Sequence, residues 1–384
     1  MKQYGDITRI SGAMLEPVDL IVGGSPCQNL SQAGNRQGLE GQESRLFLEM
    51  IRVIKQMRRE TDGVYPRYAL WENVPGAFSS NEGRDFQQVL TEFCRIAEPG
   101  TPDVPMPEEG WTKAGVLLGP DWSIAWRTHD AQFWGKAIRD SRTGNVLEMG
   151  TPQRRRRIAL VMDLRGQSAP EILFERKSVS GNSEQSEAQR KGPAESIGRS
   201  VDGATLMVFD PSVHHGYKEF GECSETVRSR YGTGGNNTPF VVATMQGFGD
   251  YVESDTASSC KQRDYKDATD QVCRIQEDQP YVRRLTPLEA ERLQGLPDNW
   301  TNIPGASDSR RYRAIGNGIA LPFWEFLAKR FVEIGEVKSI GSLFDGIGSF
   351  PLAFKRAGAE TKWTSEIEPF CEDVVRYHYE RGEL

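Results

Sequence analysis

The sequence predicts an α/β fold with a doubly wound, mostly parallel β-sheet, and three observations indicate it. Short apolar runs recur along the 384-residue chain and end in glycine or polar residues, as buried strands that open into loops do. Segments with apolar residues at helical spacing follow these runs. The alternation of the two patterns is typical of parallel strands that are joined through helices.

The N-terminal half supplies three strands and a helix of this pattern. The first strand is predicted over residues 18–24, which read VDLIVGG and lead into the loop SPCQNLS. Residues 44–59 carry apolar side chains at helical spacing. Short strands are predicted at 68–71 and 158–161, and the former ends at Glu72. We expect these elements to belong to one sheet.

The C-terminal third supplies the remaining elements. Thr286 and Glu289 form a capping-box pattern at the start of a helix, with Pro287 at its first position and Gly295 at its end. The elements predicted after it are a helix over 321–332, a strand over 339–344, a glycine-rich turn over 345–349, a helix that Gly358 ends and a strand over 361–365.

Composition limits the class of protein. The chain has no apolar run as long as a membrane span and no secretory leader in residues 1–22, so we expect a cytosolic protein. Its six cysteines form no C-x-x-C pair and no zinc-finger spacing, which predicts neither a disulfide framework nor a metal site. The net charge of −7 weighs against nucleic-acid binding, although a local basic surface is compatible with it.

The middle of the chain differs in composition from the rest. Residues 166–200 are rich in Ser, Gly, Gln, Glu and Arg and are expected to form a surface linker. From residue 205 to 273, short β-like runs lie among glycines and polar residues. This segment predicts a separate, irregular, β-rich lobe.

Cys27 and Glu72 are candidate catalytic residues because each follows a predicted strand. In a parallel sheet the carboxyl ends of the strands lie at one edge, so the two side chains could share a pocket. A thiolate could act there as a nucleophile, and a carboxyl group could donate to N3 of a pyrimidine ring. Taken alone, Cys27 is better explained as a small buried hydrophobe and Glu72 as a helix cap or surface carboxylate.

Two further patterns suit a nucleotide-like ligand and a nucleic acid. Phe344, Gly346 and Gly348 lie between a strand and a helix, where glycines let the backbone approach a ligand closely. Glu366 follows the next strand and suits ribose hydroxyls. In the run 153–157 (QRRRR), alternate arginines could face a DNA backbone or a base pocket, whereas an isolated charge run is usually solvated.

Taken together, eight segments resemble the motifs of the DNA (cytosine-5) methyltransferase family, and their coincidence is more specific than any one of them. The resemblance covers most of the chain apart from residues 166–280. The segments are Gly5-Asp6-Ile7, Ser25-Pro26-Cys27-Gln28, Glu72-Asn73-Val74, Gln153 with Arg155 and Arg157, Arg284 through Pro297, Gly316-Asn317-Gly318, Phe344 through Gly348, and Glu366-Ile367.

The order of these segments departs from the family pattern. The family begins with the motif that resembles Phe344 through Gly348, whereas here this motif and the next come last, in residues 339–384. The sequence therefore resembles a circular permutant. Two smaller departures are Gly318, where many members have serine, and residues 136–150, which separate two segments that the family keeps almost adjacent.

The resemblance implies a fold of the S-adenosylmethionine-dependent methyltransferase type with a smaller target recognition lobe. It implies S-adenosylmethionine as the cofactor, double-stranded DNA as the partner, and methylation of cytosine C5 through a covalent cysteine adduct on a flipped base. We expect a metal-free monomer in the cytoplasm of a bacterial or phage-infected cell, serving restriction-modification or phage DNA protection. The expected parts are 1–165 (first catalytic part), 166–283 (target recognition lobe), 284–335 (lobe support and return helix) and 336–384 (permuted cofactor motifs).

By resemblance, the site residues fall into three groups. The catalytic residues are Cys27, Glu72 and Arg155, of which Arg155 is expected to contact the flipped base. The cofactor site is expected to contain Asp6, Ile7, Pro26, Leu46, Asn317, Phe344, Gly346, Ile347, Gly348, Glu366 and Ile367. The residues expected to contact DNA are Gln153, Arg157, Arg228, Arg230, Lys261 and Arg263, the last four on a positive face of the target recognition lobe.

Two other functions are compatible with the same segments. One is a tRNA cytosine-5 methyltransferase on the same fold, against which the long variable segment weighs, because the RNA enzymes of this family carry a small one. The other is a catalytically inactive DNA-binding regulator, against which the intact Cys27 and Glu72 weigh.

Overall fold

The chain forms two compact units. The first comprises Met1–His129, Arg156–Ser178 and Glu325–Leu384, and the second comprises Asp130–Arg155 and Val179–Trp324. The structure is a computed structural model, and it describes residues 1–25, 46–139, 146–151, 153–174, 209–213, 216–219, 272–276, 279–283 and 285–384.

This division differs from the boundary that the sequence predicts after residue 165. The residues that follow it form the short helix α3 (Ala169–Leu173), in which Ile172 and Leu173 are buried. Arg330 holds α3 in place, because its Nε donates to the carbonyl oxygen of Ile172 at 2.7 Å. The first unit therefore continues beyond the predicted boundary, since α3 buries an apolar face against it.

The first unit is built around an eight-stranded sheet, and the predicted mostly parallel arrangement is confirmed. Its strand order is β1 (Lys2–Tyr4), β14 (Glu360–Ser365), β13 (Ser339–Leu343), β2 (Leu20–Gly24), β3 (Tyr68–Asn73), β8 (Arg156–Asp163), β5 (Ser123–Asp130) and β4 (Ala114–Leu118). The strands from β1 to β3 are parallel neighbours. By contrast, β8 runs antiparallel to β3, and β4 runs antiparallel to β5.

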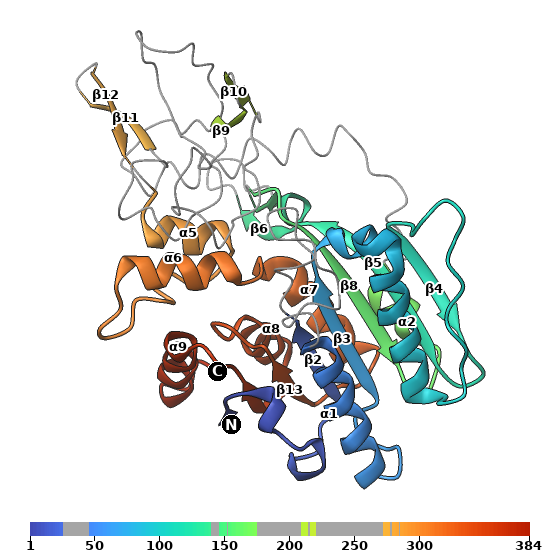
Figure 1. Cartoon of the computed structure of the whole chain (residues 1–384). Helices are drawn as coiled ribbons and strands as arrows, with labels where there is room; N and C mark the ends of the chain where they lie inside the picture. Colours follow the sequence, from blue (N-terminus) through green and yellow to red (C-terminus); the bar gives the residue numbers. More distant parts are fainter. Residues whose placement is uncertain are drawn as a thin grey trace. The chain divides into compact units, whose positions relative to one another are not determined.

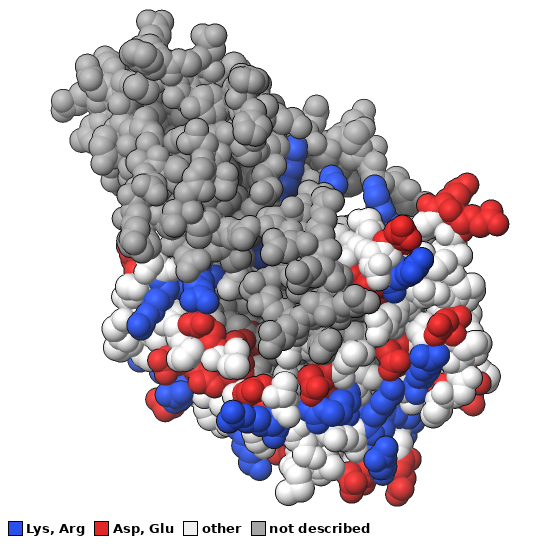
Figure 2. Space-filling model, viewed as in Figure 1, with Lys and Arg blue, Asp and Glu red and all other residues white. Residues whose placement is uncertain are grey.

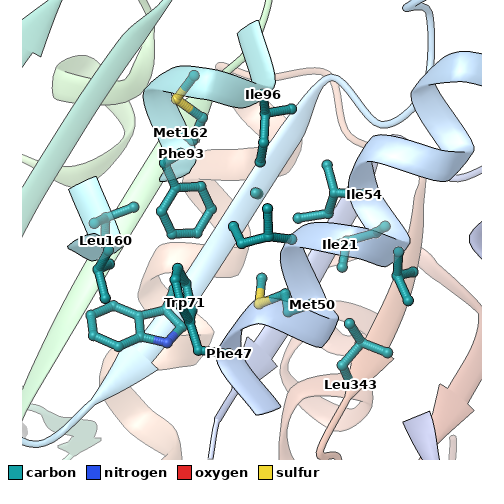
Figure 3. Packing of buried hydrophobic residues seen from close by; sticks show 14 of the residues in the cluster. Ile21, Phe47, Met50, Ile54, Trp71, Phe93, Ile96, Leu160, Met162 and Leu343 are labelled. Carbon is teal, nitrogen blue, oxygen red and sulfur yellow. The ribbon is translucent and has the colours of Figure 1, made fainter. Parts of the chain in front are cut away.

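Helices α1 (Leu46–Glu60) and α2 (Arg84–Ala97) cover one face of the sheet. The ring centroid of Phe47 on α1 lies 5.8 Å from that of Trp71 on β3 and 5.7 Å from that of Phe93 on α2. Figure 3 shows these rings packed together with aliphatic side chains of the neighbouring strands. This cluster is the main apolar core of the first unit.

The opposite face is covered by α7 (Leu321–Glu333) and α8 (Ser349–Ala357). The ring of Tyr68 on β3 lies 5.6 Å from that of Phe331 on α7, which lies 5.9 Å from that of Phe354 on α8. Successive side chains of a strand point to opposite faces, so Tyr68 and Trp71, three positions apart, contact different helix layers. Helices on both faces make the sheet doubly wound, as predicted.

Segments from the two ends of the described chain meet in this sheet. β13 lies between β14 and β2, and β14 pairs with β1. The last helix is α9 (Pro369–Glu380), and the amino group of Met1 donates to the hydroxyl of Tyr379 on it. Figure 1 marks the two ends close together.

The second unit contains α5 (Pro287–Leu293) and α6 (Asp308–Asn317). The capping box predicted for α5 is confirmed, since the Thr286 and Glu289 side chains each accept a hydrogen bond from the other's backbone N–H. The described strands of this unit form antiparallel hairpins, which pair β6 (Gly135–Arg139) with β7 (Val146–Gly150), β9 (Phe209–Val213) with β10 (Gly216–Glu219), and β11 (Val272–Gln276) with β12 (Gln279–Arg283).

Several elements have no counterpart among the predicted ones, among them β1, α2, α3, β4, β5, α6 and α9. Among the helices that the structure describes, none is long and apolar enough to cross a membrane.

Candidate active site and cofactor site

One row of backbone partners crosses the five parallel strands at their carboxyl ends. Tyr4, Ser365, Leu343, Gly23 and Trp71 are successive partners in the register of β1, β14, β13, β2 and β3. Neighbouring strands lie about 4.8 Å apart, so the five strand ends share one edge about 19 Å long. The residues that directly follow the row are Gly5, Glu366, Phe344, Gly24 and Glu72. The register thus gathers motifs from both ends of the chain.

Glu72 forms an ion pair with Arg157 at this edge. The Nε atom of Arg157 lies 2.8 Å from Oε1 of Glu72, and each side chain is 11% exposed. Arg157 is the second residue of β8, which runs antiparallel to β3 and pairs Ile158 with Asn73. A parallel strand would start at the opposite edge of the sheet. The direction of β8 therefore brings the arginine run to Glu72.

The chain that leaves β2 is held against β3. The hydroxyl oxygen of Ser25 accepts a hydrogen bond from the Trp71 indole N–H at 2.9 Å and another from the Asn73 amide at 3.3 Å. A Cβ atom at Gly24 would lie 2.6 Å from Oε2 of Glu72, so a side chain there would displace the carboxyl group. These contacts fix Ser25, the residue before Pro26 and Cys27, which themselves lie outside the described residues.

Glu366 is held by backbone donors at the other end of the edge. Its Oε2 accepts the N–H of Gly346 at 2.7 Å, and its Oε1 accepts the N–H groups of Ile367 and Glu368 at 2.9 Å each. The Glu366 N–H donates to the carbonyl oxygen of Tyr4 at 3.0 Å. The loops after β13, β14 and β1 are thereby connected through one carboxylate.

Asp6 and Ile7 lie directly after β1 on the same edge. The Asp6 carboxylate accepts the N–H of Thr8 at 2.9 Å and its hydroxyl at 2.8 Å, and these bonds lower the pKa of Asp6. Ile7 is buried. The carbonyl oxygen of Gly5 accepts the Ser365 hydroxyl at 2.7 Å, which ties this loop to β14.

The remaining cofactor candidates of the first unit differ in exposure. Ile347 is buried, whereas Ile367 is 69% exposed and offers an apolar surface beside Glu366. Phe344 adopts a positive φ of 54°, a conformation that a bulky residue rarely takes. Leu46 begins α1 and packs against the core. The structure thus brings together the described cofactor candidates of this unit, apart from Leu46, at one edge.

Asp345 also belongs to this edge, although the sequence patterns do not single it out. Its side chain is buried, and one of its oxygens accepts a hydrogen bond from the hydroxyl of Ser342. Burial raises the pKa of Asp345 to about 8, with a further contribution from the Glu366 carboxylate that the Ser342 hydrogen bond opposes. The signal available in the sequence is an acidic residue inside an otherwise apolar and glycine-rich turn.

The two predicted arginines have different partners in the structure, and their predicted roles stay predictions. Arg155, predicted to be catalytic, belongs to the second unit and is 1% exposed. Its guanidinium donates to the carbonyl oxygens of Gly316, at 3.2 Å, and Gly318. These carbonyls flank Asn317, so Arg155 caps the end of α6. Arg157, predicted to contact DNA, is instead the arginine beside Glu72.

Gln153 also has a partner inside its own unit. Sequence resemblance predicts a DNA contact, but the side chain is completely buried in the second unit. Its amide donates to the carbonyl oxygen of Leu293 at 3.0 Å. Gln153 therefore supports the end of α5, and its predicted contact with DNA stays a prediction.

The described part of the extra residues 136–150 lies in β6 and β7, whose antiparallel register pairs Gly135 with Gly150. Next to this pair along the chain, the N–H of Thr151 donates to the carbonyl oxygen of Trp134 at 2.8 Å. The segments on the two sides of the insertion therefore lie next to each other, as the family pattern places them. This arrangement explains how the arginine run keeps its position relative to the residues before the insertion.

The predicted DNA contacts of the target recognition lobe, Arg228, Arg230, Lys261 and Arg263, lie outside the described residues. Over the described part of the face in Figure 2, basic and acidic side chains are interspersed. No patch of a single charge stands out among the described residues of that face.

Known proteins resemble the chain along most of its length. A family model, C-5 cytosine-specific DNA methylase, matches residues 1–96 and 142–333. The DNA N-6-adenine-methyltransferase of Escherichia phage P1 is 26% identical over 86% of this chain and 55% of its own length. The type II methyltransferase M1.ScrFI of Lactococcus lactis subsp. cremoris is 27% identical over 87% of this chain and 67% of its own length.

The chain thus spans about half the length of the phage relative and two thirds of the lactococcal one. Among solved structures, the S. pombe Dnmt2 methyltransferase matches with a TM-score of 0.44 and 16% identity, over 86% of this chain and 83% of that chain.

Proposed function

The chain belongs to the C-5 cytosine-specific DNA methylases, and from this premise we propose that it transfers a methyl group from S-adenosylmethionine to C5 of cytosine in DNA. The observation that carries the proposal is the shared sheet edge. Glu72, the residues that lead to Cys27, and Glu366 each directly follow a strand of the same row of backbone partners. Arg157 pairs with Glu72 at this edge. A nucleophile, a carboxyl group and a cofactor loop are what covalent methylation of a pyrimidine requires.

In this proposal Cys27 and Glu72 act together on the ring. The Cys27 thiolate adds to C6. Glu72, which must take up a proton from the solvent for this step, donates it or a hydrogen bond to N3, so that C5 becomes nucleophilic. Arg157 orients that carboxyl group through the ion pair. After methylation, the C5 proton passes to the solvent, the C6–S bond breaks with its electron pair returning to the Cys27 sulfur, and N3 gives its proton back to Glu72, which restores the aromatic ring.

S-adenosylmethionine is the cofactor of this family, and the residues after β13 and β14 fit it. The Glu366 carboxylate, fixed by three backbone N–H groups, suits ribose hydroxyls. Asp345 adds a buried carboxyl group beside it, which suits a positively charged ligand. When bound, the cofactor supplies an electrophilic methyl group.

The proposal extends to the substrate and to the order of the motifs. C5 of a paired cytosine is not accessible in a duplex, so the base must be flipped out at a cost of a few kcal/mol, roughly. We propose that residues 166–283 select the DNA sequence, and that the protein serves restriction-modification or phage DNA protection. A circularly permuted order is supported by β13 and β14, which come last in the chain yet lie among strands from its beginning.

The experiment that tests this function is transfer of a labelled methyl group from S-adenosylmethionine to duplex DNA and to tRNA, followed by analysis of the modified nucleosides. We expect 5-methylcytosine in duplex DNA and no labelled tRNA. Labelled tRNA alone would favour the RNA enzyme, and no transfer to either substrate would favour an inactive DNA-binding regulator. N6-methyladenine, the product that the name of the phage relative suggests, would exclude a role for Cys27 as a nucleophile toward C6.

A further inference from the structure

Asp345 has a carboxyl oxygen for which the structure provides no partner. The side chain is 4% exposed in the turn between β13 and α8. Its Oδ1 accepts the Ser342 hydroxyl, whereas its Oδ2 is buried and has no hydrogen-bond partner among the described residues. Buried polar atoms nearly always have a partner, so an exception calls for an explanation. A ligand that binds beside the turn would supply one.

The charge around Asp345 favours a cationic ligand. The charged group that acts on it is Glu366, itself a carboxylate, and Asp6 lies on the same sheet edge. Burial is the larger cause and Glu366 adds to it, so that the pKa of Asp345 is raised to about 8 and most of the side chain is protonated at neutral pH. An approaching positive charge would reverse the preference and favour the ionised form.

The turn also leaves open space at Gly346, the residue after Asp345. Gly346 has a positive φ of 56°, and apart from its two chain neighbours a Cβ atom added there would meet no atom of the described residues within 4 Å. The N–H of Gly346 is directed to Glu366, the carboxylate expected to hold the cofactor ribose. The buried acid, the open position and the ribose-binding candidate therefore adjoin one another where β13 and β14 end.

We propose that Asp345 is the counter-charge for the cationic cofactor and releases its proton when the cofactor binds. This inference rests on the proposed function, because S-adenosylmethionine carries a positive sulfonium and a positive α-ammonium group. In the binding step the O–H bond of Asp345 breaks, its electron pair stays on the carboxylate, and the proton passes to the buffer. Ser342 is a positioning residue that holds the opposite oxygen.

Coupling of this kind makes the affinity depend on pH. Below the pKa of Asp345, the affinity for S-adenosylmethionine should rise about ten-fold for each pH unit, and it should level off above that pKa. The α-ammonium group of the ligand titrates near pH 7.7–8.0, roughly, and its titration changes the pH dependence of the affinity of every variant. The informative quantity is therefore the ratio of the wild-type affinity to that of Asp345→Asn at each pH.

The test is calorimetric titration of the full chain with S-adenosylmethionine at pH 7, in two buffers of different ionisation enthalpy. We expect the wild type to release about one proton per ligand bound and Asp345→Asn to release about none. Asp85→Asn, which alters a buried carboxyl group at the start of α2, should release as many protons as the wild type. In Ser342→Ala the Asp345 carboxylate loses a hydrogen-bond donor. The pH above which the affinity for S-adenosylmethionine stops rising should therefore be higher in this variant than in the wild type.

S-adenosylhomocysteine, which lacks the sulfonium charge, identifies the cation that Asp345 faces. If Asp345→Asn weakens binding of both ligands, the partner is the ammonium group; if it weakens only S-adenosylmethionine, the partner is the sulfonium. Wild-type protein that binds without release of a proton would overturn the inference and leave the proposed function standing. Wild-type protein that does not bind S-adenosylmethionine at all would overturn both.

Discussion

Glu72 and Glu366 each follow a strand of the same sheet edge, yet they are held in different ways. Glu366 accepts three backbone N–H groups, which the turns after β13 and β14 place there themselves. Glu72 is held by the guanidinium of Arg157, which comes from a different, antiparallel strand. Backbone donors survive the substitution of side chains, whereas an ion pair does not. The end of the edge that we propose to be catalytic, at Glu72, should therefore be more sensitive to single substitutions than the end that we propose to bind the cofactor, at Glu366.

The largest effect is expected for Cys27→Ser at the catalytic end. A hydroxyl is a far weaker nucleophile than a thiolate, so methyl transfer should fall at least about a thousand-fold. Binding of S-adenosylmethionine should stay close to that of the wild type. Methyl transfer is measured with labelled cofactor, and binding is measured by calorimetry.

A stable adduct with DNA that carries 5-fluorocytosine provides the matching test for Cys27. Fluorine at C5 blocks the last elimination, so the wild type should become covalently attached and Cys27→Ser should not. Turnover of Cys27→Ser near the wild-type rate would rule out the covalent mechanism.

Arg157→Ala should have the next largest effect. It removes the partner that orients the Glu72 carboxyl group, and a small misplacement of a catalytic group costs about 100-fold in rate. We expect kcat to fall by that factor with little change in KM for S-adenosylmethionine.

Arg67→Ala is the matched control, because Arg67 pairs with Asp163 at 3.1 Å at the other end of β8. It should lower the melting temperature without lowering the kcat of the folded protein. An equal loss of kcat in both variants would mean that Arg157 acts only through the stability of β8.

Glu366→Gln tests the cofactor end. The amide keeps one oxygen for the backbone N–H groups but loses the charge that strengthens these bonds, worth about 1.5–3 kcal/mol for a charged acceptor. KM for S-adenosylmethionine should rise about ten-fold or more, while kcat at saturating cofactor stays within a factor of a few, roughly. A fall in kcat with unchanged KM would contradict the separation between the two ends of the edge.

The smallest effect concerns the stability of the ligand-free protein. The pKa of Asp345 is raised on folding from 3.8 to about 8, so the unfolded chain ionises first as the pH rises. The free energy of unfolding of the wild type should therefore fall between about pH 4 and pH 8, and stability is retained below this window. Asp345→Asn lacks the effect, so its free energy of unfolding relative to that of the wild type should increase from pH 4 to pH 8.

Denaturant unfolding of both proteins at pH 4 and pH 8 checks this expectation. The difference between them should be larger at pH 8. An equal difference at the two pH values would mean that Asp345 is ionised in the folded protein throughout this range.

The sequence by itself determined the features that depend on neighbours along the chain. The apolar runs of β2, β3, β13 and β14, the capping box of α5 and the positions of Cys27, Glu72 and Glu366 after their strands were all readable from local pattern. α2 and β5 were missed in spite of their buried residues, because their apolar patterns were not singled out in the sequence. Cys27 itself stays a prediction, since it lies outside the described residues.

Only the tertiary structure decided which side chains meet. Arg155 and Arg157 are two residues apart in one motif, yet one caps α6 and the other pairs with Glu72. Which arginine meets Glu72 depends on the direction of β8 and on its register with β3. The residues of the motif alone do not predict either of these. Asp345 escaped notice for the same reason, because burial and the approach of Glu366, rather than its neighbours in sequence, give it an unusual pKa. Partners on neighbouring strands are set by pairing between segments that are far apart in the sequence, and local sequence patterns do not predict this pairing.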